Sequence, residues 1–171
     1  LAQPAPAEPA GNPQTMKAVL AVSGCKNSGK TTLCLKLASC LGQMGIRVGF
    51  VKHTHENALG ETGTDTGRFL SESFPSLLWG PDGLRSETKE AVPGPERAVD
   101  CLLQEVDLVL LEGGKDLPLP RIWVGSPETS PEGIRGVLAW YVREGSRGES
   151  PLFVPGEEES LARFIAGRLG V

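Results

Sequence analysis

Apolar positions along the chain follow two different spacings, which predict strands and helices in alternation. The apolar runs at 17–23 (KAVLAVS), 47–52 (RVGFVK) and 106–111 (VDLVLL) are short, as expected for strands. Segments 29–44 and 157–168 instead repeat apolar residues every three or four positions, as an amphipathic helix does. Strand 106–111 is nearly all apolar, which is typical of a parallel sheet covered on both faces. The pattern therefore predicts a three-layer α/β fold with a mainly parallel β-sheet flanked by helices.

Weaker signals complete this pattern. Gly45 follows the last apolar position of the first helix and is expected to end it. The polar segment 53–66 contains glycines and is long for a connection in a compact domain, so we expect it to be a functional loop. The remaining expected elements are helices at 67–73 and 95–104 and strands at 76–79, 84–88, 121–124, 137–142 and 152–154.

The first fifteen residues differ from the rest of the chain. They read LAQPAPAEPAGNPQT, with four prolines and almost nothing that packs. Such a composition predicts a disordered Pro/Ala-rich tail or a linker left from a larger fused protein. A single folded domain is expected over residues 16–171.

Composition narrows the class of partners. The formal net charge is −4 and the sequence pI about 5.3, so we expect neither nucleic acid nor an anionic membrane as the main partner. No stretch approaches the roughly 20 apolar residues of a membrane span, and residues 1–15 lack the pattern of a secretory signal. The four cysteines form no CxxC pair, which favours reduced, mostly packed thiols in a cytoplasmic protein: Cys25, Cys34, Cys40 and Cys101.

The strongest motif is GCKNSGKT at 24–31, which matches GxxxxGK[ST] between a predicted strand and a predicted helix. Glycines let successive backbone amides converge on phosphates, and the helix start adds unpaired N–H groups. Lys30 is expected to contact the β- and γ-phosphates, the Thr31 hydroxyl to ligate Mg²⁺, and Thr32 to lie near the α-phosphate. The predicted phosphate-binding residues are Gly24, Cys25, Lys26, Asn27, Ser28, Gly29, Lys30, Thr31 and Thr32. Lys26 itself is expected to be solvated.

Two acids flank strand 106–111. Asp107 lies near its start and Glu112 just past its end, so the strand separates them by about 16 Å. Ligands of parallel sheets bind outside the carboxyl ends of the strands, which places Glu112 beside the phosphate loop and Asp107 at the far edge. We therefore expect Glu112 to hold Mg²⁺ through water or to orient an attacking water. The alternative is a structural carboxylate that caps the strand or pairs with Lys115.

The segment KHTH at 52–55 ends the second strand at the same edge. An HxH pair binds metals in other proteins, but no cysteine or third histidine stands at a suitable spacing, so a zinc site is not expected. A polar switch-like loop with Lys52, Asp65 and Arg68 is the favoured interpretation, and a solvated surface loop is the alternative.

Taken together, the motifs resemble a known family. GCKNSGKTT at 24–32, VGFVKHTHE at 48–56, GTDTGR at 63–68 and LEGGK at 111–115, followed by PRI, occur in that order. This combination resembles the molybdopterin-guanine dinucleotide biosynthesis adaptor proteins (MobB) over about residues 17–170.

The resemblance implies a P-loop fold, GTP binding with Mg²⁺, weak GTPase activity and a homodimer. It also implies a supporting role for the guanylyltransferase that attaches GMP to molybdopterin. Catalytic roles carry over to Lys30 and Glu112, and metal ligation to Thr31 and Glu112. Asp65 lies in the loop that begins at the same sheet edge, so we expect it to approach the metal directly or through water. Contacts with molybdopterin or the partner enzyme carry over to Lys52, His53, His55, Asp65, Arg68 and Lys115.

Two alternatives stay open at this point. A P-loop kinase for a small metabolite would need an arginine-rich lid, for which Arg121 and Arg135 are sparse. The second alternative is a module that binds nucleotide without turnover. No NKxD motif is present to read guanine, and the loop between Val142 and Pro155, with Arg143 and Ser146, is a candidate in its place.

Overall fold

The computed structural model describes residues 17–54, 59, 63–72, 76–87, 96–143 and 151–171, so the tail predicted for residues 1–15 lies outside it. Its chain divides into two compact units, one formed by residues 53–97 and the other by the rest. Each unit is described by itself below.

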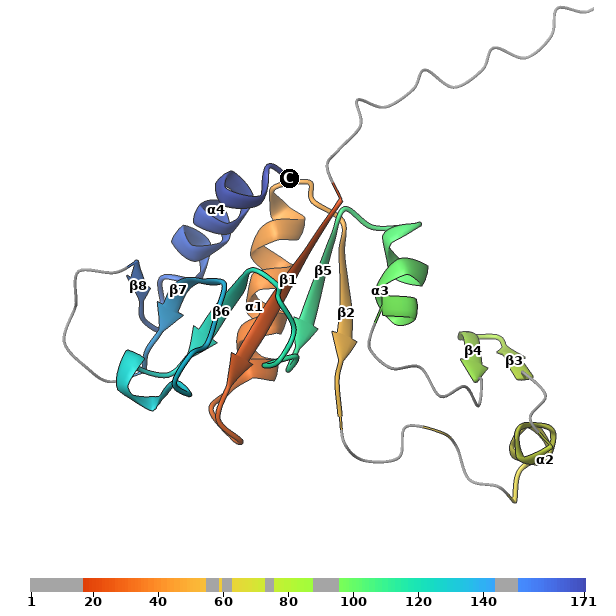
Figure 1. Ribbon diagram of the computed structural model, residues 1–171. Coiled ribbons are helices and arrows are strands. Elements are labelled where there is room, and N and C mark those ends of the chain that lie inside the picture. The colour runs from red at the N-terminus through yellow and green to blue at the C-terminus, as the bar shows by residue number, and fades with distance from the viewer. Residues whose placement is uncertain (1–16, 55–58, 60–62, 73–75, 88–95, 144–150) are drawn as a thin grey trace, which may run out of the picture. The chain divides into compact units, whose positions relative to one another are not determined.

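The larger unit is built on one sheet in which all six strands are parallel, and this confirms the predicted α/β class. The strand order is β2-β5-β1-β6-β7-β8, so β1 is central and β2 and β8 are the edges. Figure 1 shows the arrowheads of β1, β2 and β5 at a common edge. The elements of this unit are β1 (Ala18–Gly24), α1 (Lys30–Gln43), β2 (Val48–Lys52), most of α3 (Glu96–Leu103), β5 (Leu108–Glu112), β6 (Arg121–Val124), the 3-10 turn η1 (Pro127–Thr129), β7 (Val137–Tyr141), β8 (Leu152–Phe153) and α4 (Glu158–Leu169).

The main core lies on one face of this sheet. Alternate strand residues such as Leu20, Leu110 and Ile122 point to this face, because successive strand side chains alternate between faces. They pack against the apolar sides of α1 and α4, which supply buried side chains such as Leu37 and Ile165. Gly45 adopts φ 85° after α1 and ends the helix as predicted.

The opposite face is covered differently along the sheet. Beside β2, α3 approaches so closely that a Cβ on Gly49 would lie 3.2 Å from Cδ1 of Leu102. Over β1 and β6, this face carries Ser23, Arg121 and Trp123, all fully buried. Helix α3 therefore covers the part of this face beside β2. Over β1 and β6, the loop 113–120 supplies carbonyl oxygens that accept hydrogen bonds from Arg121.

One buried ionic group ties three elements of the larger unit together. Oε1 of Glu158, the first residue of α4, accepts hydrogen bonds from Nζ of Lys36 on α1 (2.6 Å) and from the Tyr141 hydroxyl of β7 (2.7 Å). Burial disfavours the Glu158 carboxylate, but these donors and two backbone amides more than compensate and lower its pKa to about 2. Glu158 therefore stabilises the packing of α4 against α1 as an anion.

The smaller unit contains α2 (Asp65–Ser71) and an antiparallel hairpin of β3 (Ser76–Gly80) and β4 (Gly83–Glu87). The helix begins two residues before the predicted start at 67. The reason is local, because the Thr64 hydroxyl accepts a hydrogen bond from the Gly67 amide (3.1 Å) and so caps the first turn.

The four cysteines are free thiols, but the expectation that most are packed is only half right. Cys34 is buried and Cys40 half-buried, whereas Cys25 and Cys101 are exposed. Burial, reinforced by the Glu112 charge, raises the pKa of Cys34 to about 12, so this thiol stays protonated and unreactive. Among the helices that the structure describes, none has the length and apolar character needed to cross a membrane.

Candidate functional site

The phosphate loop, residues 24–31, joins β1 to α1 and has the backbone of an anion-binding turn. Asn27 adopts φ 59° and Gly29 φ 92°, so two left-handed residues lie within one short turn. Left-handed residues among right-handed ones turn successive amides toward a common point and form an anion-binding concavity. The first unpaired N–H groups of α1, which begins at Lys30, extend this set of donors.

Both outer glycines of the motif are required by their surroundings. A Cβ on Gly24 would lie 2.5 Å from the carbonyl oxygen of Val124, closer than any real side chain permits. A Cβ on Gly29 would be strained by the positive φ and would lie 2.1 Å from Nη2 of Arg143. The loop thus approaches β6 and Arg143 without intervening side chains.

The side chain of Lys30 folds back across the phosphate loop. Its Nζ donates a hydrogen bond to the carbonyl oxygen of Cys25 (2.5 Å), so the lysine spans the loop from the helix side to the strand side. The ammonium therefore lies inside the motif, where it is placed to meet a phosphate. Lys26, by contrast, is exposed, as predicted for a solvated residue.

The carboxylate of Glu112 lies at the mouth of this loop. Oγ1 of Thr31 donates a hydrogen bond to Oε2 of Glu112 (2.6 Å), and Glu112 is 7% exposed. The two residues offer hydroxyl and carboxylate oxygens, which are the hard ligands that Mg²⁺ prefers. Magnesium in such sites takes its other ligands from waters and substrate phosphates, so two protein side chains fit its needs. The residues present therefore suit a Mg²⁺ held together with a triphosphate.

A buried network positions the end of β5 against β1. The Ser23 hydroxyl donates to the carbonyl oxygen of Gly113 (2.7 Å) and accepts from Nη1 of Arg121 (3.2 Å). The Gly113 amide also donates to the Val22 carbonyl (3.0 Å). Glu112 is consequently fixed by the residue that follows it.

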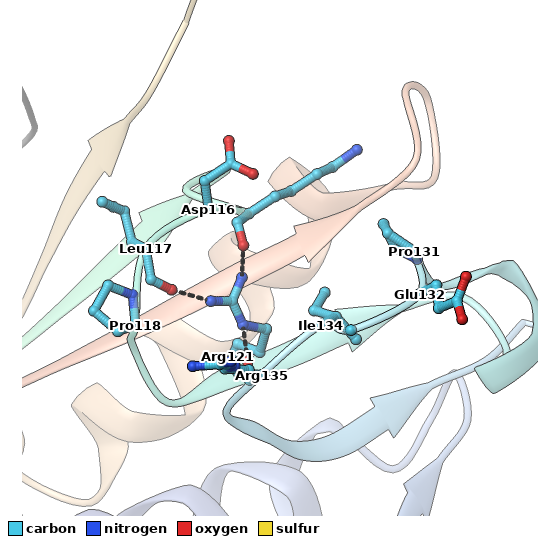
Figure 2. Close-up of a pocket in the computed structure, with 10 residues that line it drawn as sticks. Asp116, Leu117, Pro118, Arg121, Pro131, Glu132, Ile134 and Arg135 are labelled. Carbon is cyan, nitrogen blue, oxygen red and sulfur yellow. Dashed lines mark hydrogen bonds between the residues drawn. The ribbon is translucent and has the colours of Figure 1, made fainter.

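Arg121 is a fully buried guanidinium that hydrogen-bonds to backbone carbonyls instead of a carboxylate. Its donors reach the carbonyl oxygens of Gly114 (3.2 Å), Lys115 (3.0 Å) and Arg135 (2.7 Å), and that of Leu117 as well. Figure 2 shows Arg121 with its bonds to the carbonyl oxygens of Leu117 and Arg135. Burial lowers the pKa of Arg121, and the Asp116 carboxylate opposes this shift. Arg121 therefore shapes the loop 113–120 and is not free to act as a lid over a kinase substrate.

A cavity of about 490 Å³ lies beside this network, lined by Arg121 and by residues 115–118 and 131–135 (Figure 2). Nζ of Lys115 lies 5.9 Å from the centre of the Trp123 ring, in a cation–π arrangement. The cations Lys115 and Arg135 share this cavity with the carboxylates Asp116 and Glu132. Its charges are mixed, so the geometry favours neither an anion nor a cation there.

Asp107 lies outside this site, at the start of β5. Its carboxylate accepts two hydrogen bonds from the Arg47 guanidinium (2.8 and 3.1 Å) and one from the Arg47 amide (3.0 Å). These hydrogen bonds hold the pKa of Asp107 below its usual value. Its role is to join the amino ends of β2 and β5.

The predicted partner residues divide between the two units. Lys52 ends β2 and is in register with Glu112 on β5, so it lies at the phosphate-loop edge. His53, Asp65 and Arg68 belong to the smaller unit, where Asp65 and Arg68 form an exposed ion pair (3.9 Å) in the first turn of α2. His55 lies outside the described residues.

The sequence missed Ser23 and Arg121 as positioning residues. Serine at the end of a strand carries no distinctive signal. Arg121 stands in the PRI segment that follows LEGGK, and that segment was the only signal available for it.

Comparison with known proteins identifies relatives of this chain. A model of the family described as MobB, molybdopterin guanine dinucleotide synthesis protein B, matches residues 19–136. The molybdopterin-guanine dinucleotide biosynthesis adapter protein of Haemophilus influenzae is 34% identical over 113 residues, which are 61% of each chain. The chain thus aligns with about three fifths of that relative. A probable adapter protein of the same description from Bacillus subtilis is 25% identical over 70% of this chain and 71% of its own.

Solved structures agree on the fold. A crystal structure of molybdopterin-guanine biosynthesis protein B superposes with a TM-score of 0.70 and 26% identity, covering 88% of this chain and 99% of that one. A MobB homolog from Bacillus stearothermophilus gives a TM-score of 0.67 at 22% identity, covering 89% of this chain and 97% of that one. The second likeness supports the fold alone.

Proposed function

The chain belongs to the MobB family of molybdopterin guanine dinucleotide synthesis proteins, and from this premise we propose that it is a GTP-binding adaptor with weak GTPase activity. The observation that carries the proposal is the hydrogen bond between Thr31 and Glu112 at the mouth of the phosphate loop. It places a hydroxyl and a carboxylate together where the triphosphate end of a nucleotide would lie.

Different residues of the site bind the phosphates and the Mg²⁺ of the nucleotide. The amides of the phosphate loop and of the first turn of α1 donate to phosphate oxygens. Lys30 neutralises charge on the β- and γ-phosphates, and Thr32 donates near the α-phosphate. Thr31 and Glu112 would hold Mg²⁺, which supplies charge neutralisation at the terminal phosphates when bound.

Glu112 has a second role in hydrolysis. Its buried carboxylate accepts the Thr31 hydrogen bond at the mouth of the phosphate loop, and there it would orient the attacking water. A single orienting group contributes little compared with sites that add a cation for the transition state, which agrees with weak turnover.

As an adaptor, the protein assists the guanylyltransferase that joins GMP to molybdopterin. This role is supported by membership of the MobB family and by the likeness to the adapter protein of Haemophilus influenzae. Contacts with molybdopterin or the partner enzyme are assigned to Lys52, His53, His55, Asp65, Arg68 and Lys115. Lys52 and Arg68 are both exposed cations, suited to a phosphate of the pterin. A homodimer is part of the same proposal.

The experiment adds the purified chain to a guanylyltransferase reaction with molybdopterin and GTP·Mg²⁺. We expect faster formation of the dinucleotide with the chain present, and slow release of phosphate by the chain alone. No stimulation, combined with nucleoside diphosphate release that needs a small-molecule acceptor, would instead support a kinase. The matched control is the Lys30→Ala variant, which should neither stimulate nor hydrolyse.

A further inference from the structure

An exposed guanidinium lies directly over the phosphate loop. Arg143 follows the end of β7, and its Nη2 lies 2.1 Å from the position that a Cβ on Gly29 would occupy. The absence of a side chain at Gly29 therefore lets Arg143 reach the loop backbone at the start of α1.

Arg143 reaches the loop from the side opposite the acid. In the strand order, β5 with Glu112 neighbours β1 on one side, while β6 and then β7 lie on the other. The Thr31–Glu112 bond marks the metal and terminal-phosphate end of the site. If the terminal phosphate of a nucleotide lies at that end, its nucleoside extends away from Glu112. Arg143 reaches the loop from that same side, beyond β1 and β6.

The guanidinium of Arg143 is available for a ligand. It is exposed, and it has no hydrogen bond or ion pair to any residue that the structure describes. Arg47 and Arg121 differ in this respect, because Asp107 pairs with the first and backbone carbonyls surround the second.

We propose that Arg143 selects guanine by donating two hydrogen bonds to O6 and N7 of the base. A guanidinium is a planar fork of donors, and O6 and N7 of guanine are two adjacent acceptors that match it. Adenine presents N7 beside an amino group, so one donor of the fork would face another donor. This inference rests on the proposed GTP binding and names the residue that gives it specificity.

The mechanism differs measurably from recognition by a carboxylate. A carboxylate accepts from the ring N1–H and the 2-amino group of guanine, whereas Arg143 contacts neither. Inosine triphosphate lacks the 2-amino group but keeps O6 and N7, and 7-deaza-GTP keeps the amino group but lacks N7. These two analogues therefore separate the two modes of recognition.

The test is calorimetric titration of the full chain with GTP, ITP, 7-deaza-GTP and ATP in the presence of Mg²⁺. For the wild-type chain we expect ITP to bind within about 3-fold of GTP, and 7-deaza-GTP and ATP to bind on the order of 10-fold or more weakly. Arg143→Ala should bring all four affinities together, whereas Arg143→Gln, whose amide matches N6 and N7 of adenine, should shift the preference from GTP toward ATP. Arg163→Ala, which removes an exposed guanidinium from α4, is the control and should keep the wild-type order.

Three results would overturn the proposal. ITP binding far more weakly than GTP would show that a carboxylate reads the 2-amino group. Equal losses for GTP and ATP in both Arg143 variants would make Arg143 a phosphate contact. Unchanged discrimination in both variants would remove it from the site. A wild-type chain that binds none of the four nucleotides would instead count against the proposed GTP binding itself.

Discussion

The hydroxyl of Thr31 and the carboxylate of Glu112 lie 2.6 Å apart although 81 positions separate them in the sequence. The parallel pairing of β1 with β5 produces this proximity, because Val22 and Glu112 are in register near the ends of their strands. One residue comes from the phosphate loop and the other from the neighbouring strand, so the fold itself assembles the pair. Their roles lead to the first prediction.

Glu112→Gln should reduce GTP hydrolysis by about 100-fold while changing the affinity for GTP by less than about 10-fold. The amide keeps an acceptor for Thr31 but loses the negative charge. Single-turnover phosphate release and calorimetry would measure the two effects. Asp107→Asn is the matched control, and we expect it to lower stability by about 1 kcal/mol through Arg47 without affecting hydrolysis. The opposite pattern in the two variants would reverse the choice of acid.

Stability should fall in acid because of Glu158. Its pKa is about 2 in the folded chain and near 4.5 otherwise, so the unfolded chain binds the proton more readily. The stabilisation is present above about pH 4.5 and is lost as the pH falls toward 2. Between pH 4.5 and pH 2 the free energy of unfolding should therefore fall by about 2 kcal/mol less in Glu158→Gln than in the wild-type chain. Denaturant titrations at several pH values would measure it, and equal slopes in both proteins would contradict it.

Arg121→Lys should destabilise the chain by about 2–4 kcal/mol, because an ammonium cannot replace the forked donors that bind several carbonyls. The loop after Glu112 would lose its anchor, so GTP affinity should also fall at temperatures where the variant stays folded. Arg135→Lys is the control, since only its backbone carbonyl takes part in the network. Thermal unfolding and calorimetry give both readouts. Wild-type affinity in a folded Arg121→Lys variant would show that Arg121 does not position the site.

Order in the segment 63–71 should depend on nucleotide. We expect slower hydrogen exchange there with Mg²⁺ and a non-hydrolysable GTP analogue, because the sequence predicts a switch-like loop in which Asp65 responds to the metal. Equal exchange in both states would remove the switch role. The Asp65→Ala, Arg68→Ala double variant should capture less guanylyltransferase in a pull-down, and undiminished capture would separate this segment from the partner contact.

Much of the fold could be predicted from local pattern. The apolar run 106–111 and the motif at 24–31 predicted the central strands and the phosphate loop, and the observed β5 (Leu108–Glu112) is shifted by only one or two residues. The choice of Glu112 followed from the rule that parallel strands share a carboxyl edge. Lys52 was assigned to this edge by the same rule, and its register with Glu112 agrees.

What the sequence did not predict depends on contacts between distant segments. Arg121 binds carbonyls of the 113–120 loop and of Arg135, and no local spacing encodes the path of that loop. The start of α2 was wrong because the pattern of apolar residues does not reveal the Thr64 cap. Arg143 was a candidate for reading guanine, but its contact with Gly29 needs the order of β1, β6 and β7.

We propose that this chain binds a nucleoside triphosphate through its phosphate loop, and calorimetric titration with GTP and Mg²⁺ is the decisive measurement. The wild-type chain should bind, and Lys30→Ala should weaken binding by about 100-fold, or about 2.7 kcal/mol, because the ammonium meets the phosphates. Lys26→Ala removes an exposed lysine of the same loop and should stay within about 3-fold of the wild-type affinity. Unchanged GTP affinity in a folded Lys30→Ala variant would contradict the account.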